Sequence, residues 1–158
     1  GPLQTAWLAS LENHPERQLS GTLGQGSSRS YKACCLGELH ICAFRARKER
    51  FPFSDGFKIF DQGEAEWQKD TATLDYSYEQ YGLRSADGVI SARSGQGLGF
   101  CYFATVGVIS EERCKELYDK HGVKSLFSLA MLNDYDFTWP EIAAFIRKFP
   151  TKVFYKSV

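Results

Sequence analysis

The sequence predicts a single α+β domain in which several helices pack on a small antiparallel sheet. Hydrophobic residues make up 43% and aromatic residues 15% of the 158-residue chain, which is enough to fill one core. Apolar residues recur at helical spacing in several segments, and glycine-rich turns flank short aromatic or β-branched segments. We expect the domain to span residues 3–156, and Gly1-Pro2 resembles the remnant of a removed expression tag.

The first predicted helix covers residues 3–13 and is followed by a short strand or turn. Trp7, Leu8 and Leu11 recur in it at helical spacing, so they form a stripe that can be buried. Pro15 then stops the helix, because proline cannot continue one.

The second predicted helix begins near Cys34 and ends in a basic segment, residues 45–50. Cations at a helix C-terminus interact favourably with the helix dipole. The apolar stripe of this helix has helical spacing and comprises Cys35, Leu39, Cys42 and Ala46.

Glycine, proline and aromatic residues interrupt the periodicity between residues 51 and 99. The pattern predicts a short strand at 57–60, a helical turn at 64–69, a helix or irregular segment at 74–81 and a strand at 89–90. Phe100 to Val108 is rich in aromatic and β-branched residues, and this segment carries the best-supported strand prediction.

The last third of the chain carries the clearest helix boundaries. Ser110 is an expected N-cap with acidic residues after it, and Gly122 is an expected C-cap. A further helix or helical turn is expected over residues 125–132. Thr138 and Glu141 form a predicted capping box, which starts a final helix that ends before Pro150.

Composition limits the partners and the compartment. The chain has 19 basic and 19 acidic residues, and this neutrality argues against a nucleic-acid partner, which usually requires a basic surplus. No apolar run is long enough to span a membrane, and no signal peptide is recognisable. The five cysteines are an odd number and two of them are adjacent, which favours reduced thiols in a cytoplasm.

Two motifs carry a resemblance to known proteins. The chain contains Cys34-Cys-Leu-Gly37 and, far downstream, Leu132-Asn-Asp134 followed by a Phe-x-x-x-x-Ile-Ala segment. In this order they resemble a family of small phage and prophage proteins that has no established activity. The resemblance implies a phage or prophage protein in the host cytoplasm, and an accessory or counter-defence role. This chain departs from the family at His40, where members often have another cysteine.

A thiol nucleophile is the sharpest enzymatic hypothesis, with Cys35 and His40 as its candidates. A cysteine at a helix N-terminus has a lowered pKa, but catalysis also needs a base. His40 lies five positions after Cys35 and cannot reach it within one helix, so an inert buried thiol and a non-enzyme are favoured. The cysteines and histidines lack metal-ligand spacing, so we expect no metal and no cofactor.

A ligand site is a second possibility. Two glycine runs, at residues 24–26 and 95–99, could surround a phosphate, although flexible hairpin loops are the simpler explanation. Asp134 could bind a cation or an amine, but the simpler interpretation is that Asn133 and Asp134 hydrogen-bond the backbone of a turn and help to cap the following helix. The candidate ligand-binding residues are Arg29, Lys32, Arg84, Arg93, Tyr102 and Asp134.

Three functions remain open from the sequence. The leading hypothesis is a non-catalytic phage or prophage protein that binds and inhibits a host protein or sequesters a ligand. Its preferred interface is the aromatic segment 51–81, because aromatic residues dominate interface hot spots, with Trp67, Tyr76, Tyr78 and Tyr81 as candidates. The alternatives are a module for a small nucleotide-like ligand and a cysteine hydrolase. The sequence does not indicate an oligomeric state.

Overall fold

The computed structural model describes residues 1–21, 23–26, 30–47, 57–58, 77–85, 88, 90, 97–122 and 125–157. The helices are α1 (Pro2–Asn13), η1 (Pro15–Arg17, a 3-10 helix), α2 (Cys35–Arg47), α4 (Ser77–Gln80), α5 (Phe100–Thr105), α6 (Glu111–His121), α7 (Leu129–Asp134), α8 (Trp139–Lys148) and α9 (Pro150–Val153). The strands are β1 (Gly24–Gly26), β2 (Tyr31–Ala33) and β3 (Phe57–Lys58).

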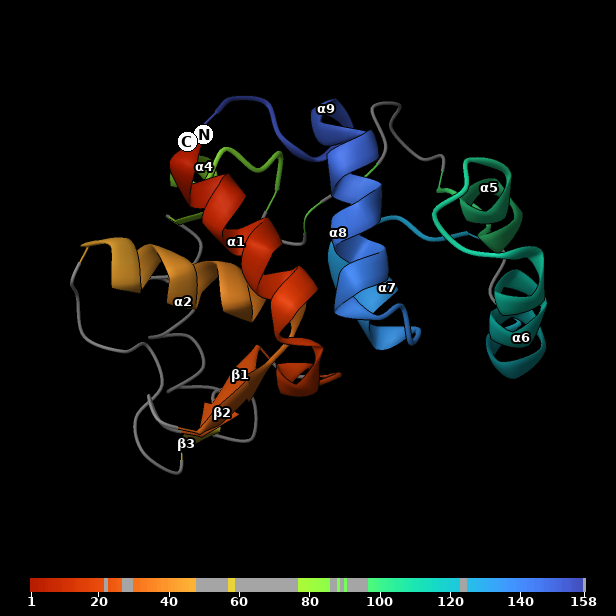
Figure 1. The fold of residues 1–158 in the computed structure, drawn as a ribbon, viewed down its shortest axis with the longest axis horizontal. Helices are drawn as coiled ribbons and strands as arrows, with labels where there is room; N and C mark the ends of the chain where they lie inside the picture. The colour runs from red at the N-terminus through yellow and green to blue at the C-terminus, as the bar shows by residue number, and fades with distance from the viewer. Residues whose placement is uncertain are drawn as a thin grey trace.

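The predicted α+β class is confirmed. The three strands form an antiparallel sheet in the order β2-β1-β3, with Gln25 of β1 opposite Lys32 of β2 and Lys58 of β3. In Figure 1, α1 and α2 lie on one side of α8, α5 and α6 lie on the other, and the sheet lies below α2. Helix α8 is therefore the central element of the molecule.

The core follows the predicted helical stripes, except that Ala46, predicted in the stripe of the second helix, is exposed. Trp7, Leu11 and Leu39 are buried where α1 crosses α2, and Ile142 and Phe145 are buried on α8. Arg147 near the end of α8 forms an ion pair with Glu12 of α1, so the two helices are also joined at the surface. Burial of these apolar side chains supplies the main driving force for the packing.

The local helix signals are confirmed at three helix ends. The Ser110 side chain accepts a hydrogen bond from the Arg113 backbone N–H, which caps α6. Gly122 ends that helix with φ 62°, a conformation that glycine adopts without steric cost. The Thr138 hydroxyl and the Glu141 carboxylate form the reciprocal capping box at the start of α8.

The strand prediction for Phe100 to Val108 is wrong, because this segment begins with α5. Gly99 precedes the helix, and Phe100 and Phe103, three residues apart, are both buried while Cys101 is exposed. Phe103 packs against Phe137 with ring centroids 4.9 Å apart. Burial at helical spacing outweighed the strand preference of aromatic residues, which depends strongly on context.

Two other boundaries also differ from prediction. Helix α7 begins at Leu129, after Ser128 has capped it, and not at Ser125. Leu126 instead exchanges backbone hydrogen bonds with Leu98. Ile90 is not in a strand, although its N–H donates to the Phe127 carbonyl, and Val89 lies outside the described residues.

Candidate functional site

The two adjacent thiols lie at the start of α2, where they are sealed in the core. Cys35 is fully buried, and its Sγ lies 3.6 Å from the Leu129 carbonyl, to which it donates. Burial raises the pKa of Cys35 well above its ordinary value and raises the pKa of Cys34 to about 11. Only the thiolate is nucleophilic, so both groups are held in their unreactive form.

His40 does not act on either thiol. Its ring is buried, and Nδ1 forms a hydrogen bond of 2.9 Å with the Tyr81 hydroxyl. The two rings meet edge to face with centroids 5.1 Å apart. Burial lowers the pKa of His40 to about 3, so the imidazole is neutral at physiological pH. A neutral histidine paired with a tyrosine explains a polar residue inside the core.

Asn133 connects the two sequence motifs directly. Its side chain is fully buried, and Oδ1 accepts hydrogen bonds from the backbone N–H of Cys35 at 3.0 Å and from the Trp139 indole at 3.2 Å. Its Nδ2 donates to the Leu19 carbonyl at 2.7 Å. A side-chain amide here satisfies an N–H at the start of α2 that has no partner within the helix. The prediction of a simple turn residue is therefore wrong for Asn133.

The rest of both motifs also has a structural explanation. A Cβ at Gly37 would lie 1.8 Å from the Leu23 carbonyl oxygen, so only glycine fits where α2 packs on this segment. Asp134 is exposed, and its Oδ1 accepts a hydrogen bond of 2.9 Å from the Gly21 backbone N–H. These contacts hold the segment between η1 and β1 against α2 and α7.

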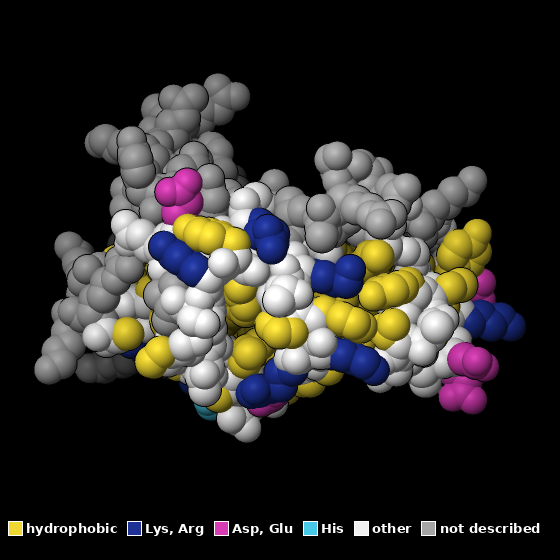
Figure 2. Space-filling model, turned by 90° about the horizontal axis from the view of Figure 1, so that it is seen from above, with side chains coloured by type: hydrophobic (Ala, Val, Ile, Leu, Met, Phe, Trp, Pro, Cys, Tyr) yellow, Lys and Arg dark blue, Asp and Glu magenta, His cyan; other side chains and the backbone are white. Residues whose placement is uncertain are grey.

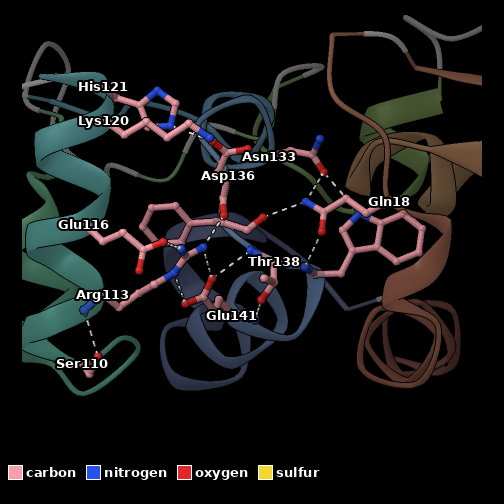
Figure 3. A network of polar contacts seen from close by, with 12 residues as sticks. Gln18, Ser110, Arg113, Glu116, Lys120, His121, Asn133, Asp136, Thr138 and Glu141 are labelled. Atoms are coloured by element: carbon pink, nitrogen blue, oxygen red, sulfur yellow. Dashed lines mark hydrogen bonds and ion pairs between the residues drawn. The ribbon is translucent and has the colours of Figure 1, made fainter.

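A second polar network joins α6 to the start of α8 (Figure 3). Arg113 donates to both carboxylate oxygens of Glu141 at 3.3 Å and to the Asp136 carbonyl at 2.6 Å. Asp136 has a φ of 66°, and its Oδ2 lies 2.6 Å from Lys120 Nζ and 2.8 Å from His121 Nε2. The hydrogen bond from Lys120, assisted by His121, lowers the pKa of Asp136. The network fixes a strained turn between α7 and α8.

A buried carboxylate in α2 was not identified from the sequence. Glu38 has no exposed surface, and its oxygens accept from the hydroxyls of Tyr31, at 2.7 and 2.9 Å, and of Ser10. Arg17 lies 3.9 Å from the carboxylate and donates to the Tyr31 hydroxyl at 3.0 Å. Burial, with a further contribution from Glu38, raises the pKa of Tyr31 well above its usual range. The sequence signal that could have identified this buried carboxylate is an acidic residue inside the apolar stripe of α2.

The predicted ligand residues that the structure describes do not converge on one site. Arg29 and Arg93 lie outside the described residues, and Lys32 is exposed on β2. Arg84 and Tyr102, in contrast, both lie beside α9: Arg84 donates to the Thr151 carbonyl, and the Tyr102 ring packs against Phe149. In Figure 1, β2 lies near the bottom of the molecule and α9 at its top. Among the described candidates, Lys32 therefore lies apart from Arg84 and Tyr102.

Of the predicted interface side chains, one lies among the described residues. Trp67 and Tyr76 lie outside the described residues, as does the side chain of Tyr78 in α4. Tyr81 is 1% exposed and contacts His40 in the core, so it cannot contribute to a surface in this structure. The prediction of Tyr81 as an interface residue is therefore wrong. A tyrosine ring can be buried when its hydroxyl has a hydrogen-bond partner, and here that partner is His40.

Within the described ranges, no group of three or more histidine, cysteine, aspartate or glutamate side chains is placed to hold a metal ion. None of the helices described is long and apolar enough to cross a membrane. Comparison with protein-family models, curated proteins and solved structures produced no match.

Proposed function

We propose that this chain is a non-catalytic binding protein of phage or prophage origin that acts in the host cytoplasm. It serves as an accessory or counter-defence factor, and inhibits a host protein by occupying it. The phage origin and the counter-defence role derive from the sequence motifs. The non-catalytic assignment derives from one observation, the sealing of the Cys34-Cys35 pair in the core.

The pKa values quantify this support. With its pKa raised to about 11 by burial, the Cys34 thiol remains protonated at pH 7. The pKa of Cys35 is also raised, well above its ordinary value, and His40 is hydrogen-bonded to the Tyr81 hydroxyl. A thiol enzyme needs a thiolate beside a base and open to substrate. The motif cysteines meet none of these requirements.

A complex with a host protein tests the proposal. The purified chain is incubated with host lysate and separated by size-exclusion chromatography, and co-eluting proteins and small molecules are identified by mass spectrometry. We expect a stable complex with one dominant host protein. Elution of the chain alone, without protein or small molecule, contradicts the proposal.

Cys35→Ala is the matched variant for this experiment. Because the thiol serves in packing, the variant should retain the host complex as long as circular dichroism shows a native spectrum. Alanine leaves a small cavity, so its stability is measured in parallel. If folded Cys35→Ala loses the host complex, or if the wild-type chain forms a covalent adduct at Cys35, the enzyme hypothesis replaces this one.

A nucleotide-like ligand is the second candidate, because Arg84 and Tyr102 both contact helix α9, Arg84 at Thr151 and Tyr102 at Lys152. Aromatic rings and arginine are common components of nucleotide sites. Thermal unfolding with mono-, di- and cyclic nucleotides distinguishes this alternative, since a ligand that binds only the native state raises Tm. No shift at saturating concentrations removes it.

A further inference from the structure

The charges of this neutral chain are unevenly distributed along it. Residues 142–158 contain four cations, Arg147, Lys148, Lys152 and Lys156, and no aspartate or glutamate. They occupy the last turn of α8, helix α9 and the segment after it. Of the four, Arg147 is paired with Glu12. Within the described part of the chain, no ion pair involves Lys148, Lys152 or Lys156.

A fourth cation, Arg84, lies beside the same segment although it is distant in sequence, and it forms no ion pair with another described residue. The Nε and Nη2 atoms of Arg84 donate to the Thr151 carbonyl at 3.2 and 3.0 Å, and its backbone N–H donates to the Val153 carbonyl. Lys148 Nζ donates to the Val106 carbonyl at the end of α5. Carbonyl partners orient these two cations without neutralising them, so the positive charge remains available to an incoming anion.

Aromatic rings separate the cations. Lys152 Nζ lies 6.0 Å from the Tyr102 ring centroid and 5.9 Å from that of Phe149. Lys156 Nζ lies 5.3 Å from the ring centroid of Tyr155, which is 47% exposed. The face above α8 and α9 in Figure 2 shows dark-blue side chains alternating with yellow ones, and magenta is sparse there. The surface therefore offers apolar contact between positive charges.

We infer that this C-terminal basic face, formed by Arg84, Lys148, Lys152 and Lys156 with the rings of Tyr102, Phe149 and Tyr155, docks an acidic polypeptide segment of the partner. The inference rests on the proposed binding function and identifies the chemistry of the partner. Carboxylates of such a segment pair with the cations, and its apolar side chains pack on the rings. Complementary charge also accelerates the encounter of two proteins.

The same face is poorly suited to nucleic acid. Single-stranded nucleic acid binds by stacking its bases on open aromatic faces. Here lysine ammonium groups lie over Tyr102, Phe149 and Tyr155, and Tyr155 is also tied by its hydroxyl to the Glu79 carbonyl. Acidic residues elsewhere balance the cations of the whole chain, so a long polyanion would meet repulsion beyond this face. A short acidic segment avoids both difficulties.

Fluorescence anisotropy with two labelled probes tests the inference. One probe is a peptide of about twelve residues that alternates glutamate with leucine, and the other is a thymidine oligonucleotide of equal length. We expect the peptide to bind wild-type protein more tightly than the oligonucleotide does, and to bind more weakly as salt rises, because salt screens exposed charges. Lys152→Glu/Lys156→Glu should weaken peptide binding about tenfold or more, through lost attraction and added repulsion.

The matched control is Lys32→Glu/Lys115→Glu, which makes the same charge change at exposed lysines on β2 and α6. It should keep peptide affinity within about twofold, since charges beyond a Debye length are screened. Should the first double variant fail to fold, Lys152→Ala/Lys156→Ala removes the charges without repulsion. Equal losses in both glutamate variants, tighter binding of the oligonucleotide, or no peptide binding by wild type each overturn the inference. A host complex that survives Lys152→Ala/Lys156→Ala also overturns this face, yet leaves the binding function intact.

Discussion

The polar side chains around α2 are buried, whereas those around α6 are partly exposed to solvent. Near α2, Glu38, His40 and Asn133 are buried, and each is matched by hydrogen-bond partners from other elements. Near α6, Arg113 and Asp136 form comparable contacts but remain partly open to solvent. Water can replace a lost hydrogen-bond partner at the surface, but it cannot do so in the core. Removing a polar side chain near α2 should therefore lower the free energy of unfolding more than removing one near α6. Function is therefore expected on the surface, and stability is concentrated around α2.

The largest contrast concerns thiol reactivity. Cys101 is exposed and should react with an aromatic disulfide reagent on mixing, whereas Cys34 and Cys35 should react only when the core opens. Since opening of a stable core is rare, we expect the two rates to differ by about a thousandfold or more. Mass spectrometry of labelled peptides gives the rates, and denatured protein provides the control. Equal labelling of Cys35 and Cys101 in native protein would show that the core is not sealed.

The next largest effect is expected at Asn133. Asn133→Ala removes one side chain that serves four partners and leaves the Cys35 N–H and the Leu19 carbonyl unsatisfied in the interior. We expect the free energy of unfolding in urea to fall by about 3–5 kcal/mol. Asp134→Ala, the adjacent exposed position, should cost about 1 kcal/mol or less. Similar losses in both variants would remove the special role of Asn133.

The buried imidazole predicts acid sensitivity. Because the pKa of His40 is about 3 in the native protein and near 6.5 when unfolded, the unfolded chain binds the extra proton first. The stabilisation is complete above about pH 6.5 and is lost as pH falls below that value. Between pH 6.5 and 5 the free energy of unfolding should fall by about 2 kcal/mol.

His40→Gln tests this dependence, because glutamine can still bond to the Tyr81 hydroxyl but does not titrate. Urea unfolding is measured at pH 6.5 and at pH 5. Between these pH values, the free energy of unfolding of the variant should fall by about 2 kcal/mol less than that of the wild type. Lowered carboxyl pKa values, such as that of Asp136, contribute to acid sensitivity in both proteins and cancel in the comparison. Parallel pH profiles for the two proteins would contradict a buried neutral imidazole.

The smallest effect is expected in the solvent-accessible network. Arg113→Ala breaks the ion pairs with Glu141 and Glu116 and the hydrogen bond to the Asp136 carbonyl. We expect a loss of about 1 kcal/mol that shrinks at high salt, because the pairs are partly exposed. Lys115→Ala on the same helix is the control and should be neutral. A loss as large as that of Asn133→Ala would erase the distinction between the two regions.

Local signals were predictable where neighbours along the chain decide the outcome. The caps at Ser110 and Gly122 and the capping box of Thr138 and Glu141 involve residues within a few positions of one another. Their hydrogen bonds form in any context in which the helix forms, so the sequence identifies them. The α+β class followed from the same periodicity.

The sequence by itself determined both ends of α6, the start of α8, most of the apolar stripes and the acid-free C-terminal segment. Tertiary structure alone decided that Phe100 begins a helix, that Tyr81 is buried against His40, and that Asn133 lies against the N-terminus of α2. It also decided which cations share a face, since Arg84 reaches α9 only through the fold. Burial and hydrogen-bond partners at such separations depend on which elements meet in space, and residue type and local spacing do not encode that.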